Sequence, residues 1–123
     1  MPDKFLGEVR NNFQFLYNKY FALEGEHTYD NLPQGNSVIV LMLDKLQIRI
    51  QNVRGEVSIQ FSKTRNSSRR ESAWVTVGQA ARKLGAKNVG SSLTDPKAKL
   101  SEKSKDLELF LGEYFDKFKK VFI

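Results

Sequence analysis

Apolar and polar residues alternate most regularly in the middle of the chain, where the pattern predicts three β-strands. Residues 38–43 form a continuous apolar run, whereas residues 46–51 and 56–62 alternate strictly. A period of two with many β-branched residues is typical of half-buried strands. Residues 44–45 and 52–55 lie between these runs, and the second of these segments has the composition of a tight turn with a glycine. The pattern therefore predicts a three-stranded antiparallel meander with one apolar face.

Two segments at the ends of the chain show the helical period instead. Apolar residues recur every three or four positions within residues 3–23, after Asp3 as a candidate N-cap, and again from Asp106 to the C-terminus. A Thr94-Asp95-Pro96 helix-start signature precedes the second series. Each segment is expected to form an amphipathic helix. The apolar series are Leu6, Val9, Phe13, Leu16 and Tyr20 in the first, and Leu107, Phe110, Leu111, Tyr114, Phe118 and Val121 in the second.

The remaining segments are assigned by their breakers and by shorter patterns. Residues 23–37 contain two glycines and one proline and are interpreted as a connector. Residues 72–77, which include the single tryptophan, Trp74, predict a fourth strand with Trp74 at least partly buried. Residues 79–84 predict a short helix that ends at Gly85.

Together these elements predict an α+β fold formed by one domain over residues 1–123. The sheet is expected to be antiparallel with about four strands. The N-terminal and C-terminal amphipathic helices are expected to pack on one face of that sheet and to touch each other, because both need the same apolar surface.

Composition excludes several classes of protein. The 123 residues include no cysteine, which rules out disulfides, thiolate metal sites and a cysteine nucleophile and fits a reducing compartment. No apolar run approaches the length of about 18 residues that a membrane span needs, and the N-terminus lacks a secretory signal. We therefore expect a cytoplasmic, bacterial protein that does not enter a membrane.

The net charge of +6 is concentrated in one segment. Residues 63–87 contain seven basic side chains and one acidic side chain, so they carry the whole excess. A basic segment attracts nucleic acid or another polyanion, although a solvated loop would have the same composition. The polyanion-binding candidates are Lys63, Arg65, Arg69, Arg70, Arg82, Lys83 and Lys87. Lys63, Arg65, Arg69 and Arg70 are expected to share one exposed loop.

Evidence for catalysis or for a bound cofactor is missing from the sequence. It contains neither a phosphate-binding glycine loop nor a nucleophile elbow. The single histidine, His27, lies between Glu26 and Asp30, but no second histidine is present to complete a zinc site. We therefore expect His27 to be an ordinary surface residue. We assign no catalytic, cofactor-binding or metal-binding residue and interpret the chain as non-enzymatic.

The order of elements from Phe5 to Trp74 resembles that of small uncharacterised bacterial α+β proteins, including some toxin-immunity proteins. This resemblance implies a cytoplasmic protein that neutralises a toxin by binding it. Immunity proteins against nucleases are commonly acidic, whereas this chain is basic, so the resemblance points to a target other than a nuclease. A protein-interaction role with another protein as partner is the leading hypothesis. Nucleic-acid binding through residues 63–87 is the alternative, disfavoured because the polar strand face offers no aromatic residue. The oligomeric state does not follow from the sequence.

Overall fold

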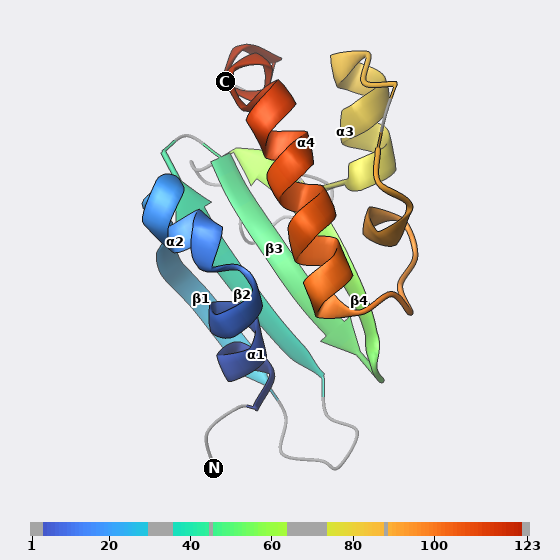
Figure 1. Cartoon of the computed structure of the whole chain (residues 1–123). Coiled ribbons are helices and arrows are strands. Elements are labelled where there is room, and N and C mark those ends of the chain that lie inside the picture. The colour runs from blue at the N-terminus through green and yellow to red at the C-terminus, as the bar shows by residue number, and fades with distance from the viewer. Residues whose placement is uncertain (1–3, 30–35, 45, 64–73, 88, 122–123) are drawn as a thin grey trace.

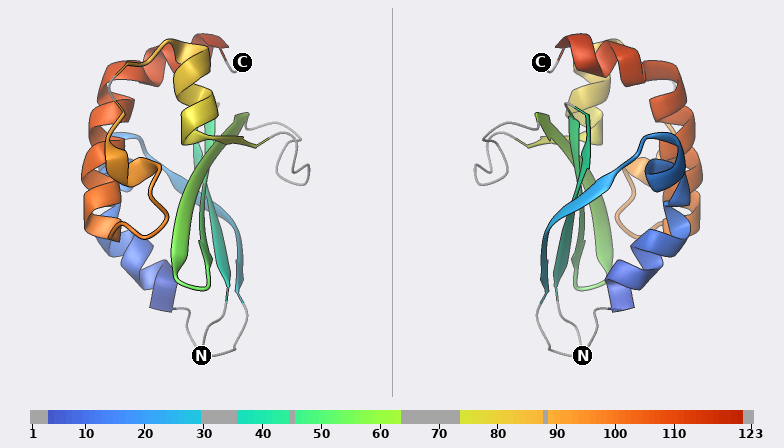
Figure 2. Two further views of the ribbon diagram at one scale, coloured as in Figure 1. Left: turned by 90° about the vertical axis from the view of Figure 1, so that its right-hand side faces the viewer. Right: turned by 90° about the vertical axis from the view of Figure 1, so that its left-hand side faces the viewer.

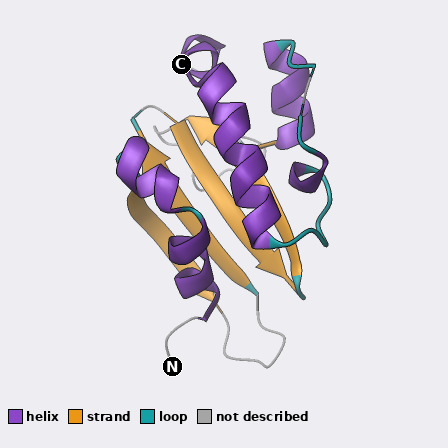
Figure 3. Ribbon diagram, in the orientation of Figure 1, coloured by secondary structure: helices purple, strands orange, loops and turns teal. Residues whose placement is uncertain are grey.

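The chain folds into two layers, an antiparallel β-sheet and a set of helices over one of its faces (Figures 1 and 3). The structure is a computed structural model that describes residues 4–29, 36–44, 46–63, 74–87 and 89–121. The described part of the chain begins near one end of the molecule and finishes near the other (Figure 1).

The sheet contains five strands whose spatial order is their order in the chain, β1-β2-β3-β4-β5. All neighbouring strands are antiparallel. β1 and β5 are therefore the outer strands. The strands are β1 (Leu23–Tyr29), β2 (Ser37–Leu43), β3 (Leu46–Val53), β4 (Glu56–Lys63) and β5 (Val75–Thr76).

The helices all lie on the same side of the long strands, so the described residues place no helix over the opposite face (Figure 2). We call this opposite face the open face. The helix layer comprises α1 (Lys4–Asn12), α2 (Gln14–Lys19), α3 (Val77–Leu84), the 3-10 turn η2 (Ser91–Leu93) and α4 (Leu100–Val121).

The β3–β4 hairpin has the turn that its sequence predicts. Arg54 and Gly55 both have positive φ, 54° and 85°, and they connect the paired residues Val53 and Glu56. A two-residue loop with positive φ at both positions matches the right-handed twist of the flanking strands. The side chain of Asn52 accepts a hydrogen bond from the Gly55 N–H at 2.9 Å, which fixes the turn further.

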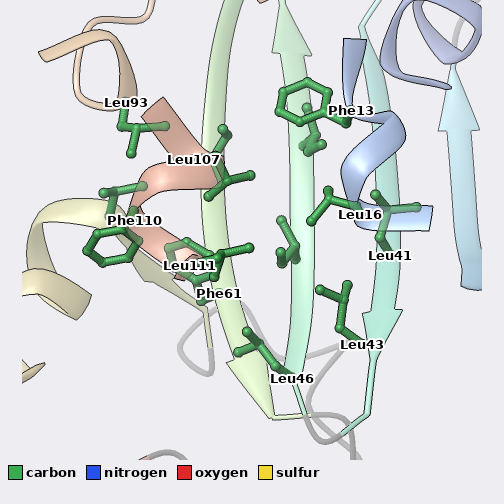
Figure 4. Close-up of a cluster of buried hydrophobic side chains, with 14 of the residues drawn as sticks. Phe13, Leu16, Leu41, Leu43, Leu46, Phe61, Leu93, Leu107, Phe110 and Leu111 are labelled. Carbon is green, nitrogen blue, oxygen red and sulfur yellow. The ribbon is translucent and has the colours of Figure 1, made fainter. Parts of the chain in front are cut away.

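The core fills the space between the sheet and the helices (Figure 4). Apolar side chains from alternate positions of β2, β3 and β4 meet the apolar stripes of the helices. The ring of Phe61 on β4 lies 4.8 Å from that of Phe118 and 6.2 Å from that of Phe110, centroid to centroid. Residues labelled in Figure 4 that belong to this core are Phe13, Leu16, Leu41, Leu43, Leu46, Phe61, Leu93, Leu107, Phe110 and Leu111.

This architecture confirms the predicted α+β fold, and α1 and α4 do touch. The interpretation of residues 23–37 as a connector was wrong for residues 23–29, which form β1, and for Ser37, which begins β2. Residues 30–35 lie outside the described part of the chain. The strand was missed because Gly25 and the charged residues around it are typical of a loop. The register with β2 shifts between Glu24 and His27, which marks a β-bulge.

The N-terminal segment is two helices rather than one. The helical geometry is interrupted at Phe13, which has φ −108° and ψ 36°. The Phe13 side chain is nevertheless fully buried, like Val9 before it and Leu16 after it. Because the apolar stripe continues across the interruption, the periodicity could not reveal it.

The fourth predicted strand is shorter than expected. β5 contains only Val75 and Thr76, and residues 72–73 lie outside the described part of the chain. Thr76 ends the strand because its side chain caps α3: its hydroxyl accepts from the Gln79 N–H, and the Gln79 side chain accepts from the Thr76 N–H. This reciprocal capping box fixes the helix start. Gly85, at φ 68°, ends α3 as predicted.

No helix in the described part of the chain is both long and apolar enough to cross a membrane.

Candidate protein-binding surface

The start of β1 exposes two large apolar side chains. Phe21 is 79% exposed and Leu23 is 66% exposed, whereas Ala22 between them is buried. Single exposed apolar residues are common, but here two of them lie one residue apart where the outer strand begins. We call Phe21 and Leu23 the edge patch.

The backbone at Phe21 is in an unusual conformation. Phe21 follows the last turn of α2 and has φ 56°, in the left-handed region. A helix commonly ends in this conformation, but glycine normally occupies the position because a Cβ atom is strained there. The Ala22 N–H donates to the Leu16 carbonyl at 2.9 Å, so this tight connection turns the chain from α2 into β1. The chain thus holds an exposed phenylalanine where glycine would be favoured.

A shallow hollow lies next to the edge patch, between the helices α1 and α2 and the start of β1. Its volume is about 520 Å³. Its wall combines hydrogen-bonding side chains from the helices with the apolar start of the strand. The lining residues are Arg10, Gln14, Tyr17, Asn18, Ala22, Leu23 and Glu24.

Glu24 connects the two sides of this hollow. Its carboxylate accepts hydrogen bonds from both Nε and Nη2 of Arg10, each at 2.7 Å, and from the Tyr17 hydroxyl at 2.8 Å. A bidentate guanidinium–carboxylate pair has a fixed geometry. The network therefore connects β1 to both α1 and α2.

The same contacts shift the ionisation of the two acidic groups. The hydrogen bond from Arg10 is the main reason that the pKa of Glu24 lies below its ordinary value. Burial, followed by the hydrogen bond to Glu24, raises the pKa of Tyr17 well above its ordinary value. Glu24 is thus held ionised and Tyr17 protonated near neutral pH. This arrangement suits a structural clamp rather than proton transfer, which needs a pKa near the working pH.

The open face of the sheet carries a polar network that includes an aromatic residue. Arg49 Nε donates to Gln60 Oε1 at 2.8 Å, and Gln60 Nε2 donates to Ser58 Oγ at 2.9 Å. The Arg49 guanidinium also lies over the Trp74 ring, 4.7 Å from its centroid. The polar positions of the meander itself carry no aromatic residue, as predicted, but Trp74 from outside the meander packs against this face. Trp74 is buried, as predicted.

The predicted basic residues are only partly placed by the structure. Arg82 and Lys83 lie in the last turn of α3, and Lys87 follows that helix; all three are exposed. The backbone of Lys63 belongs to the end of β4 rather than to a loop, paired with Leu46, which corrects the expected position. Arg65, Arg69 and Arg70 lie outside the described residues. The common loop predicted for these four residues stays a prediction.

His27 lies in β1 opposite Ile39, not in a loop. Among the described residues, no group of three or more histidine, aspartate or glutamate side chains is arranged to hold a metal ion.

The edge patch was not predicted, because Phe21 was included in one helix over residues 3–23, whereas α2 ends at Lys19. The sequence contains one signal for the end of this helix. Its regular apolar stripe stops at Tyr20, directly before Phe21, and Gly25 follows a few residues later. The exposure itself depends on the turn at Phe21, which only the structure shows. Comparisons with protein-family models, with curated proteins and with solved structures find no match to this chain.

Proposed function

We propose that this chain is a non-enzymatic protein-interaction protein whose partner binds at the edge patch. Exposed aromatic residues beside a structured rim are enriched at the centres of protein interfaces. The hollow beside Leu23 offers space for a partner side chain, and its polar wall offers hydrogen bonds from Gln14 and Asn18.

The exposure of Phe21 in a left-handed backbone conformation carries this proposal. Both features are unfavourable for the isolated protein: a large apolar surface faces water, and a Cβ atom occupies a strained region. Exposed apolar side chains and strained backbone conformations of this kind are expected at functional sites. A partner that covers Phe21 would recover the apolar burial.

The proposal is tested by placing a photo-cross-linking phenylalanine analogue at position 21 in the native cell. We expect a discrete cross-linked polypeptide, identified by mass spectrometry. The matched control places the same analogue at Leu109, which is 68% exposed on α4 and lines a different hollow, together with Val89 and Glu113. In a binding assay with the identified polypeptide, Phe21→Ala is expected to weaken affinity about tenfold or more, and Leu109→Ala is not.

Two results would contradict the proposal: no adduct from position 21, or the same set of adducts from positions 21 and 109. A toxin-neutralising role is a specific form of the proposal. It is supported if the cross-linked polypeptide inhibits growth when it is expressed alone and does not when it is expressed together with this chain.

Polyanion binding is the second candidate, because Arg82, Lys83 and Lys87 are exposed close together in the chain. The competing structural explanation is that basic residues stabilise the C-terminal end of a helix such as α3. Titration with labelled single-stranded and double-stranded nucleic acid at two salt concentrations separates these roles. Polyanion binding predicts affinity that falls steeply with salt and a smaller slope for the double substitution Arg82→Gln and Lys83→Gln. No binding at low salt rejects this candidate.

A further inference from the structure

The polar side chains that line the hollow beside the edge patch differ in how far the chain itself satisfies them. Arg10, Tyr17 and Glu24 are hydrogen-bonded to one another. Gln14 and Asn18 line the same hollow and are exposed, and neither side-chain amide makes a hydrogen bond to another described residue. Each of these two amides therefore keeps an oxygen that can accept hydrogen bonds and a nitrogen that can donate them.

The charged groups of the hollow neutralise each other. The guanidinium of Arg10 binds the carboxylate of Glu24 through two of its nitrogens. None of the other described side chains that line the hollow carries a charge. A charged group that entered the hollow would lose part of its hydration and would find no unpaired counter-charge, so the hollow favours a neutral ligand group that can form hydrogen bonds.

The spacing of the two amides matches that of an extended polypeptide backbone. Gln14 and Asn18 are four residues apart in α2, so they lie on the same side of the helix and about 6 Å apart along its axis. In an extended chain, every second residue directs its N–H and C=O groups to the same side, with a repeat of about 6.6 Å. One carboxamide can accept from the N–H and donate to the C=O of a single residue. The two amides can therefore bind two alternate residues of one extended segment.

The other wall of the hollow is apolar and comes from the start of β1. Ala22 and Leu23 form this wall, and Leu23 belongs to the edge patch together with Phe21. Side chains of an extended segment alternate between its two faces. Every second side chain can therefore pack against Leu23 while the others face water, so a segment with alternating apolar and polar residues fits this wall.

We infer that the hollow binds an extended, uncharged segment of the partner polypeptide. The backbone of this segment forms hydrogen bonds with the side-chain amides of Gln14 and Asn18, and its alternate apolar side chains pack against Leu23. The inference rests on the proposed protein-binding function and specifies which part of the partner is recognised. Hydrogen bonds to the backbone supply affinity for many sequences, whereas the alternating side chains supply specificity.

The probe for this inference is a labelled, uncharged peptide of about seven residues that is blocked at both ends and alternates valine with threonine. Its fluorescence anisotropy is measured with the full chain. We expect saturable binding whose affinity changes less than about twofold between low and high salt, because no net charge takes part.

N-methylation of the peptide tests the predicted backbone contacts. One variant is methylated at the nitrogens of all valines and the other at the nitrogens of all threonines, so the side chains are the same in both. Only alternate N–H groups can face the two amides. We therefore expect one of the two variants to bind at least about tenfold more weakly than the parent peptide and the other to bind much more like the parent.

Alanine substitutions test the two amides of the chain itself. We expect Gln14→Ala and Asn18→Ala each to weaken binding of the parent peptide about tenfold, because each removes one pair of hydrogen bonds. The matched control is Asn11→Ala, which removes an exposed amide of α1 that does not line the hollow and should leave peptide binding unchanged. All three positions are exposed, so the variants are expected to fold, which circular dichroism checks.

The inference would be overturned if the parent peptide does not bind, if both methylated peptides bind equally, or if affinity falls steeply with salt. Equal loss of binding in Asn11→Ala and in the two hollow variants would also overturn it. Sedimentation of the chain alone provides a further test: a dimer that Gln14→Ala and Asn18→Ala dissociate would assign the hollow to a second copy instead.

The inference and the proposed function can fail separately. A cross-link from position 21 to a polypeptide whose binding is unchanged by Gln14→Ala and Asn18→Ala would retain the proposed function and reject the extended segment in the hollow. Absence of any cross-link from position 21 would reject the proposed function itself.

Discussion

Phe21 places a bulky side chain at the residue that turns the chain from α2 into β1. Its φ of 56° would be relaxed by glycine, and its 79% exposure means that little burial is lost when the side chain is removed. The folded state therefore gains little from this side chain and bears the strain of its Cβ atom. If a partner binds this phenylalanine, the residue that favours binding at position 21 differs from the residue, glycine, that favours folding.

We expect Phe21→Gly to leave the free energy of unfolding unchanged or to raise it by up to about 1 kcal/mol, while it abolishes partner binding. Urea unfolding followed by Trp74 fluorescence measures the first effect. Leu109→Ala, at a comparably exposed position in a helix, serves as the control and should change the stability by less than about 0.5 kcal/mol. A loss of more than about 1 kcal/mol in Phe21→Gly would show that the side chain packs against the fold.

The Glu24 network gives a second prediction at the scale of single residues, a pH dependence. Because the pKa of Glu24 is lowered by folding, the unfolded state binds more protons when the pH lies just below the ordinary pKa of about 4.3. The contribution of Glu24 is therefore present above that pH and is lost as pH falls through the folded pKa. The pKa of Tyr17 is raised, so its contribution is present below about pH 10 and is lost at higher pH.

Glu24→Gln should accordingly be less stable than the native chain at neutral pH, and the difference should shrink as the solution is acidified below about pH 4. Urea unfolding of both proteins across the acidic range measures the difference directly. Glu113→Gln, at an exposed position on α4, is the control. A difference that is independent of pH would mean that Glu24 contributes through packing alone.

At the scale of elements, Lys103 connects α4 to the segment that precedes it. This lysine is buried, and its ammonium donates to the carbonyls of Ser92 and Asp95. Burial lowers its pKa, against the opposing effect of the Asp95 and Glu102 carboxylates. The same segment supplies the Pro96 carbonyl that accepts from Val57 on β4. Lys103 therefore helps to keep the β4 edge covered.

Lys103→Met preserves the length and most of the packing of this side chain but leaves two carbonyls without their donor. We expect a loss of about 2–4 kcal/mol in the free energy of unfolding and faster hydrogen exchange of the Val57 amide. Lys105→Met, which changes an exposed lysine of α4, should stay within about 0.5 kcal/mol of the native chain. Unchanged exchange at Val57 would show that the Pro96 contact does not depend on Lys103.

At the scale of the whole molecule, one continuous core joins the sheet to helices from both ends of the chain. Phe110 of α4 packs on Phe61 of β4, and Ser104 of α4 donates to the carbonyl of Asn12 at the end of α1. Neither the sheet nor the helix layer can bury its apolar face without the other. We therefore expect the two layers to unfold together.

Phe110→Ala tests this coupling. The substitution removes a buried aromatic ring and should lower the free energy of unfolding by about 3–5 kcal/mol. The unfolding transitions measured by far-ultraviolet circular dichroism and by Trp74 fluorescence should coincide and shift to the same extent, because Trp74 lies on the open face, across the sheet from Phe110. Separate transitions for the two probes would show that the layers are independent.

Local sequence signals were sufficient to predict several elements of this fold. The alternation in residues 46–51 and 56–62, the turn at Arg54 and Gly55 and the stripe around Phe110 each follow from periodicity or from turn chemistry, and they fix the α+β class. These patterns are visible in the sequence alone because each strand or helix must present its own apolar face to the core. The burial of Phe13 and Phe110 was predictable for the same reason.

Other features depend on contacts between residues distant in sequence, so they follow only from the folded chain. β1 is a strand because β2 supplies its hydrogen bonds, although its own residues have little strand pattern. Lys103 is buried because carbonyls eight and eleven residues earlier in the chain fold back onto it. Phe21 is exposed because the chain turns at that residue instead of extending α2. The candidate surface rests on this turn and on the outer position of β1, and both arise from packing that no local pattern encodes.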